Sequence, residues 1–195
     1  SYRLVGSEMC IRDSLYGKKE LLDQTKNLNH EFLASEIPYT MNPGGPNHEE
    51  LACLSGVTDY YETLYSHHFT EQGLNLHEKG KKVFELIYNH EETLIKTLIE
   101  FLKLKKNVRL IGKTSHSRSE RMPTVSFTVK DKSSLEIAKA AGKNQIGIRN
   151  GEFYAWRCLK GLGIEPNDGV VRVSMVHYNN IEEVNRLIDF LDTIL

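Results

Sequence analysis

One arginine interrupts an otherwise apolar segment near the end of the chain. Residues 170–176 read Val-Val-Arg-Val-Ser-Met-Val, so Val171 and Val173 flank Arg172. Alternate side chains of a β-strand face opposite sides of the sheet, which places Arg172 away from the face that holds the valines. A guanidinium group there needs a partner, and a carboxylate is its best match because it accepts two parallel hydrogen bonds. Arg172 is therefore predicted either to bind a ligand carboxylate or to form a structural salt bridge.

A second arginine, Arg149, closes another predicted strand. Residues 146–149 favour a strand, and Asn150-Gly151 then predicts a turn into a helix. This order allows Arg149 to lie at the mouth of a cleft, although an ordinary surface arginine fits the same pattern.

A glycine pair precedes an expected helix in the first half of the chain. Gly44 and Gly45 come shortly before Asn47, which is a good N-cap residue and is followed by His48. The amides of a glycine turn and of a helix N-terminus can together bind an anion such as phosphate. A plain turn followed by an N-cap is the alternative.

The periodicity of apolar residues predicts the elements that position these groups. From residue 107 onward the order is β-β-α-β-α-β-α, which is typical of a small α/β domain of about four strands with helices on one face. A long helix precedes this domain, and Gln72-Gly73 separates that helix from an earlier one beginning at Asn47. The predicted helices are 76–105, 133–141, 152–162 and 180–195, and the predicted strands are 108–111, 124–129, 146–149 and 170–176.

The charge balance narrows the classes of function. The 195 residues contain 25 Lys and Arg against 26 Asp and Glu, which excludes a globally basic nucleic-acid binder. A binding module that uses the basic segment 103–121 for RNA or an acidic partner remains the alternative. Charged residues interrupt every apolar run before the about 18 residues that a membrane span needs. His67, His68 and His77 lack the spacing of metal ligands, and the three distant cysteines favour a cytoplasmic compartment.

Taken together, these segments resemble the C-terminal part of class V aminotransferase-fold enzymes, and most closely their cysteine desulfurase-like branch. The resemblance implies fold type I, pyridoxal phosphate as cofactor, an amino-acid substrate and a homodimer. It covers residues 15–195 and depends on the order and spacing of five segments, which are Leu15–Leu22, Gly44–Glu49, Arg121–Phe127, Arg149–Gly151 and Val171–Asn179.

The resemblance also implies roles for individual residues. Arg172 matches the arginine that binds the substrate α-carboxylate, and Arg149 matches a second arginine near the substrate. The loop with Gly44, Gly45, Asn47 and His48 matches one that reaches the cofactor phosphate of the neighbouring subunit.

Several positions depart from the pattern of that family. Gly45 replaces a threonine, so only backbone amides could serve there. Tyr154 stands where desulfurases carry a nucleophilic cysteine, and we interpret Cys158, four residues later, as a packing residue of a short helix. Desulfuration by another route, transamination, elimination and epimerisation therefore all remain open as reactions.

The resemblance suggests a division of the chain. Residues 15–75 are expected to be the trailing helical edge of a large cofactor domain, 76–106 a connecting helix, and 107–195 the small domain. Residues 1–14 show neither the helical nor the strand periodicity of apolar residues, and they are expected to be foreign sequence or a ragged terminus. The chain is interpreted as a C-terminal fragment that does not catalyse alone.

The last expectation concerns the lysine that binds the cofactor in this family. The family's cofactor lysine should lie shortly before Leu15, but residues 1–14 contain no lysine. We therefore expect that the purified chain, treated with pyridoxal phosphate and then borohydride, forms no stoichiometric adduct with one lysine. Mass spectrometry of a tryptic digest would detect such an adduct, and a stoichiometric product at Lys18 or Lys19 would contradict this expectation.

Overall fold

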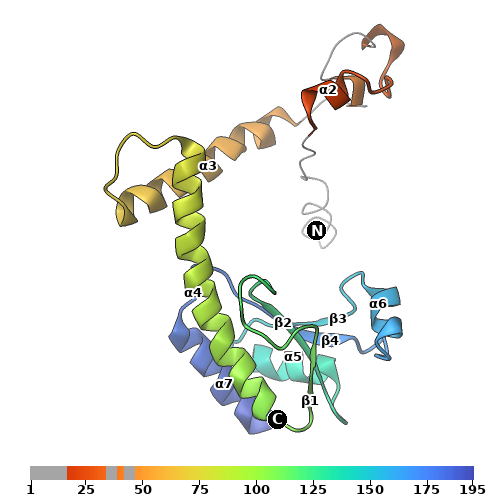
Figure 1. Ribbon diagram of the computed structural model, residues 1–195. Helices are drawn as coiled ribbons and strands as arrows, with labels where there is room; N and C mark the ends of the chain where they lie inside the picture. Colours follow the sequence, from red (N-terminus) through yellow and green to blue (C-terminus); the bar gives the residue numbers. More distant parts are fainter. Residues whose placement is uncertain (1–16, 34–38, 42–46) are drawn as a thin grey trace. The chain divides into compact units, whose positions relative to one another are not determined.

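The computed structural model describes residues 17–33, 39–41 and 47–195 (Figure 1). The chain divides after Tyr60 into two compact units, each described by itself. The first unit contains the short helix α2 (Lys19–Leu22), two 3₁₀ turns (Glu31–Leu33 and Tyr39–Met41) and the beginning of helix α3 (His48–His68). Asn47 caps α3, because its side-chain Oδ1 accepts a hydrogen bond of 3.1 Å from the backbone N–H of Glu50. This agrees with the predicted helix start.

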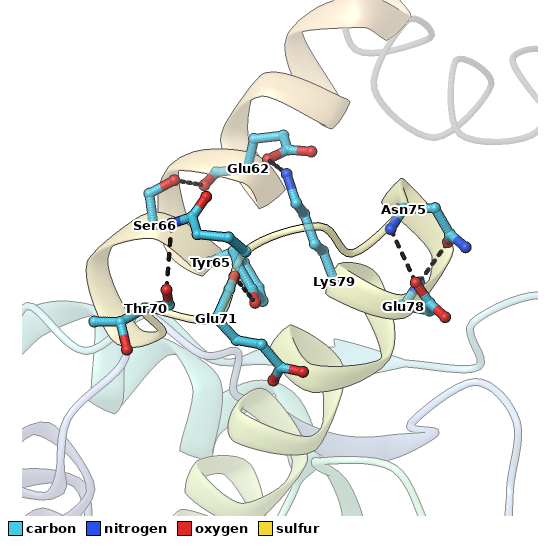
Figure 2. Close-up of polar contacts among 9 residues, drawn as sticks. Glu62, Tyr65, Ser66, Thr70, Glu71, Asn75, Glu78 and Lys79 are labelled. Carbon is cyan, nitrogen blue, oxygen red and sulfur yellow. Dashed lines mark hydrogen bonds and ion pairs between the residues drawn. The ribbon is translucent and has the colours of Figure 1, made fainter.

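A short connection joins α3 to helix α4 (Leu76–Leu104) in the second unit (Figure 2). The connection contains Gly73 with a φ of 84°, a backbone conformation that glycine adopts without strain. Tyr65 donates a hydrogen bond from its hydroxyl to the Glu71 carbonyl, at 2.8 Å. Asn75 and Glu78 form a capping box, which satisfies two backbone amides at the start of α4. The predicted interruption at Gln72-Gly73 is thus confirmed.

The rest of the second unit is a four-stranded antiparallel sheet with helices, in the strand order β1-β2-β4-β3. The α/β class and the predicted order of elements are confirmed. The elements are β1 (Val108–Ile111), β2 (Thr124–Val129), α5 (Ser134–Lys143), β3 (Arg149–Gly151), α6 (Trp156–Gly161), β4 (Val170–Ser174) and α7 (Ile181–Ile194).

The hydrophobic core lies on one face of this sheet. Val125 pairs with Val173 and Phe127 with Val171, so these four buried side chains share a face. Helices α4 and α7 pack against each other there (Figure 1), and α5 contacts β3 and β4. Each fully buried Leu, Ile, Val or Phe stabilises the fold by about 1.5–3 kcal/mol. The helical side chains of this core include Leu94, Ile95, Leu98, Ile99, Leu102, Ile137, Val184, Leu187 and Leu191.

Helix α6 is the exception to the expected layering. Its Leu159 forms a smaller cluster with Ile164 and Val170. Val170 and Arg172 are two residues apart on β4 and therefore share the face opposite the core. Part of this second face is thus covered by α6, whereas Thr124, Arg149 and Ser174 on the same face are exposed among the described residues.

Several predicted boundaries were wrong. Strand β4 ends at Ser174 rather than at residue 176, and helix α5 continues through Gly142 to Lys143. The predicted turn at Asn150-Gly151 is instead part of strand β3.

Strand β3 begins at Arg149 rather than at residue 146, because Ile146 and Ile148 pack against the main core instead of continuing the ladder with β4. Helix α6 begins at Trp156 rather than at residue 152, because Phe153 and Tyr154 have φ values of 49° and 59° that a right-handed helix cannot contain.

No helix among residues 17–33, 39–41 and 47–195 is long and apolar enough to cross a bilayer.

A close backbone contact between two glycines brings β3 against β4. Gly151 pairs with Val170, and Gly169 precedes that residue with a φ of 70°. A Cβ atom added to Gly169 would lie 2.2 Å from the carbonyl carbon and oxygen of Gly151. Only glycine fits at this point, since backbone atoms cannot move aside as a flexible side chain can.

Gly169→Ala should therefore destabilise the second unit by about 3 kcal/mol or more, because it combines an overlap with a left-handed backbone. Urea unfolding followed by circular dichroism measures this change. Gly142→Ala is the matched control, since it adds the same methyl group to a helix with no heavy atom within 4 Å. That variant should be more stable by about 0.5–1 kcal/mol. Equal stability of the two variants would contradict the role assigned to Gly169.

Candidate anion site on the open face of the sheet

Two arginines lie directly opposite each other on the open face of the sheet. Arg149 of β3 pairs with Arg172 of β4, and Ser126 of β2 pairs with Arg172 from the other side. Side chains of directly paired residues in antiparallel strands share a face. The sequence predicted the side on which Arg172 projects, but it did not predict that Arg149 would be its neighbour.

The guanidinium group of Arg172 stacks on an aromatic ring instead of pairing with an acid. Its Cζ atom lies 3.9 Å from the centroid of the Phe153 ring. Its Nε atom is buried without a hydrogen-bond partner. Among the described residues, no carboxylate forms an ion pair with Arg172 or Arg149. The structural salt bridge that was the alternative for Arg172 is therefore not formed within the described part of the chain.

The two arginines are in an unfavourable electrostatic environment. Two like charges directly opposite each other on neighbouring strands destabilise a sheet. A buried hydrogen-bond donor without an acceptor adds a cost of about 1–3 kcal/mol. An anion bound between the two guanidinium groups would relieve the repulsion between them.

The segment after β4 is held rigidly by hydrogen bonds. Asn179 accepts a bond from the Val176 amide at 2.9 Å through Oδ1, and its side-chain nitrogen donates to Glu183 at 2.9 Å. Its backbone carbonyl lies 2.7 Å from Nε2 of His90, on α4. Helix α4 thereby fixes the end of the strand that carries Arg172.

Glu91 of α4 adds a buried carboxyl group next to this segment. Its exposed fraction is 8%, and it lines a cavity of about 190 Å³ together with His116 and Arg121. Burial raises the pKa of the Glu91 carboxyl above its usual value, while the charge and the backbone amide of His177 and the charge of His90 act in the opposite direction. Folding therefore makes the Glu91 carboxyl easier to protonate than it is in the unfolded chain.

Most cations of the basic segment 103–121 are engaged within the fold. Lys105 pairs with Asp192 at 2.5 Å, Lys113 with Glu120 at 2.9 Å, and Arg118 with Glu85 at 2.5 Å. The other two arginines of the segment donate to backbone carbonyls, those of Leu162, Lys113 and Thr124. Because these cations are engaged within the fold, the RNA-binding or acidic-partner module is not the favoured interpretation.

The remaining predicted site residues belong to the first unit. Asn47 and His48 are exposed at the N-terminus of α3, whereas Gly44 and Gly45 lie outside the described residues. Within the described ranges, no cluster of His, Cys, Asp or Glu could hold a metal ion.

Cys158 was wrongly interpreted as a packing residue. It is exposed on α6, and the adjacent Leu159 takes the buried position.

Sequence reasoning missed Glu91 and Phe153. Glu91 could have been found, because it occupies a position in the apolar stripe of α4 four residues after Ile87 and four before Ile95. Phe153 gave no such signal. Its position under Arg172 depends on a left-handed backbone that the sequence does not indicate.

The fold defines a small α/β domain in which Arg149 and Arg172 lie opposite each other on one face of the sheet. The family model described as aminotransferase class-V matches residues 80–187, more than half of the chain. The chain therefore belongs to the class-V aminotransferase family. Members of this family in general use pyridoxal phosphate, act on amino-acid substrates and typically function as dimers.

Individual relatives agree with this assignment. The aminotransferase-like protein FGM3 of Gibberella zeae is 33% identical over 195 residues, which are the whole of this chain and 44% of that protein. The cysteine desulfurase-like protein ustD of Aspergillus flavus is 28% identical over the whole chain and 41% of its own length. The chain thus spans less than half the length of the curated relatives it matches.

A solved structure shows the same fold. The cysteine desulfurase CsdA of Escherichia coli aligns with a TM-score of 0.64 and 18% identity, over 91% of this chain and 41% of CsdA. The predicted resemblance to cysteine desulfurase-like proteins is confirmed.

The buried carboxyl group of Glu91 should make the stability of the fold depend on pH. The pKa of Glu91 is raised in the folded state, so its contribution to stability is full at low pH and is lost as the pH rises through the folded pKa. Glu91→Gln mimics the protonated form, so its stability relative to the original chain should increase from pH 4.5 to pH 7.5. Urea midpoints at the two pH values measure this difference. Glu100→Gln changes an exposed residue on the same helix, and its urea midpoint should match that of the original chain at both pH values. The prediction would be contradicted if the difference between Glu91→Gln and the original chain were the same at both pH values.

Proposed function

We propose that this chain is the C-terminal part of a pyridoxal-phosphate-dependent enzyme that acts on an amino acid, and that Arg172 binds the α-carboxylate of that substrate. The observation that carries the proposal is the unpaired state of Arg172, whose guanidinium has no carboxylate partner among the described residues. An arginine left in this state by its own fold is suited to an external carboxylate, which can accept two hydrogen bonds from it.

Arg149 and Arg172 would act together on this carboxylate. Arg172 fixes its position through the planar fork of the guanidinium group, and Arg149 adds a second positive charge directly across the strand pair. The negative charge of the bound carboxylate reduces the repulsion between the two arginines, and this reduction favours binding. The rigid segment around Asn179 keeps the end of β4 in place during this step.

The N-terminus of α3 is the part of this chain suited to a phosphate group. The amides of His48 and Glu49 precede the first amides bonded within the helix, so they can donate to an anion. Gly44, Gly45, Asn47 and His48 would hold the cofactor phosphate of a neighbouring subunit in a homodimer. Pyridoxal phosphate, when bound, supplies the electron sink that weakens the bonds at the α-carbon of an amino acid.

Tyr154 bears on the type of reaction. Its side chain is 95% exposed and carries a phenol rather than a thiol. We propose that the reaction does not use a cysteine nucleophile at this position, which leaves desulfuration by another route, transamination, elimination and epimerisation.

The intact enzyme would be cytoplasmic and would have the predicted domains. Residues 107–195 would form its small domain, and residues 15–75 would form the edge of its cofactor domain. Because residues 1–14 contain no lysine, we propose that this chain does not catalyse alone.

Arg172→Lys tests the carboxylate site. Lysine keeps the charge but loses the two-point contact, so the affinity of the chain for acetate should fall by roughly 10- to 100-fold, or about 1.5–3 kcal/mol. Titration followed by NMR measures this affinity, and methylammonium serves as a cation that should not bind.

The matched control is Arg109→Lys, which changes an arginine on β1 that donates to the Leu162 carbonyl. This variant should bind acetate like the original chain. A purely structural Arg172 would give the opposite pattern, in which Arg172→Lys lowers the melting temperature and leaves acetate affinity unchanged.

A further inference from the structure

Two neighbouring aromatic residues between β3 and α6 hold an unfavourable backbone conformation. Phe153 and Tyr154 have φ values of 49° and 59°, in the left-handed region. This region costs an ordinary L-residue roughly 1–2 kcal/mol. Such strain persists only where the surrounding structure enforces it, and it is frequent at binding sites.

The contacts of Phe153 show what enforces the strain. Phe153 packs against the cluster of Leu159, Ile164 and Val170 on the open side of the sheet. Its ring also lies under Arg172, with Cζ 3.9 Å from the ring centroid. The left-handed backbone thus places an aromatic ring between a small apolar cluster and a guanidinium group.

An aromatic ring holds an arginine differently from an acid. A carboxylate partner would occupy the in-plane N–H donors of the guanidinium and would compete with any ligand for them. A ring contacts only the flat face, so it restrains the orientation of the group without using those donors. Of the three guanidinium nitrogens, Nε is the one that is buried without a partner, so a ligand must approach the terminal Nη1 and Nη2 atoms.

We propose that Phe153 is a positioning residue that fixes the plane of Arg172, so that a carboxylate binds end-on across Nη1 and Nη2. This inference rests on the proposed role of Arg172 in substrate binding. It adds that the orientation of the guanidinium is set in advance by stacking, which reduces the entropy lost when the carboxylate binds.

The test uses the 195-residue chain and acetate as the carboxylate probe. Phe153→Leu keeps an apolar side chain for the cluster but removes the ring, and should lower acetate affinity by about fivefold. Phe153→Tyr keeps the ring and should restore the affinity to within about twofold of the original. In ¹⁵N-edited NMR spectra, the Nε–H signal of Arg172 should show an upfield ring-current shift in the original chain and in Phe153→Tyr, and should lose it in Phe153→Leu.

Two outcomes of the variants would overturn the proposal. One is an unchanged acetate affinity in Phe153→Leu, and the other is an equal loss in the Leu and Tyr variants, since that loss would come from disturbed packing. A measurement on the original chain alone gives a further test. Rotation about the Nε–Cζ bond should be slower in Arg172 than in the exposed Arg149, and equal rates would overturn the proposal even if a variant failed to fold.

These results also separate the two proposals. If Arg172→Lys binds acetate normally, the proposed substrate role of Arg172 is wrong. If Arg172→Lys loses acetate binding but Phe153→Leu does not, Arg172 binds the carboxylate and the positioning role of Phe153 alone is wrong.

Discussion

Strand β4 runs between β2 and β3, and its side chains must alternate between the two faces of the sheet. Val171 and Val173 are buried in the core with Val125 and Phe127, which fixes the register of the strand. A shift by one residue would move Arg172 into the apolar core, at a cost of several kcal/mol. The direction of Arg172 is therefore set by the burial of its neighbours.

The same register brings the second arginine into place. Strand β3 is only three residues long, and it meets β4 where Gly151 and Gly169 allow the backbones to approach closely. This contact sets Arg149 opposite Arg172. A site with two positive charges is thus held by apolar packing on one side of the sheet and by a glycine contact at one end of the strand pair. Neither feature needs an acidic residue near the arginines.

The sequence predicted the parts of this arrangement that depend on local patterns. The cap at Asn47, the interruption at Gly73 and the bounds of β1 and β2 agree with the structure, because N-caps, glycine turns and alternating apolar residues act over a few positions. The strand patterns singled out Arg172 and Arg149, and the resemblance to a family suggested their roles. The order of the strands in the sheet was not predicted, since it depends on contacts between residues far apart in the chain.

The prediction failed where tertiary contacts overrode local preference. Residues 146–149 have the composition of a strand, yet Ile146 and Ile148 contribute to the core instead of the ladder. Phe153 and Tyr154 fit a helix by pattern, but their backbone is left-handed. Both departures lie next to Arg149 and Arg172. Local rules are commonly broken beside functional sites, because the geometry of a site is maintained by the whole fold.

Helix α4 takes part in two separate hydrophobic clusters. Val83 and Ile87 pack with Tyr65, whereas Leu94 and the residues after it belong to the main core. His90 and Glu91 lie between these clusters and contact the segment that follows β4. A helix of 29 residues is about 44 Å long and behaves as a stiff rod. The middle of α4 is hydrogen-bonded to the segment that follows β4. A tilt of α4 would therefore also move the end of the strand that carries Arg172.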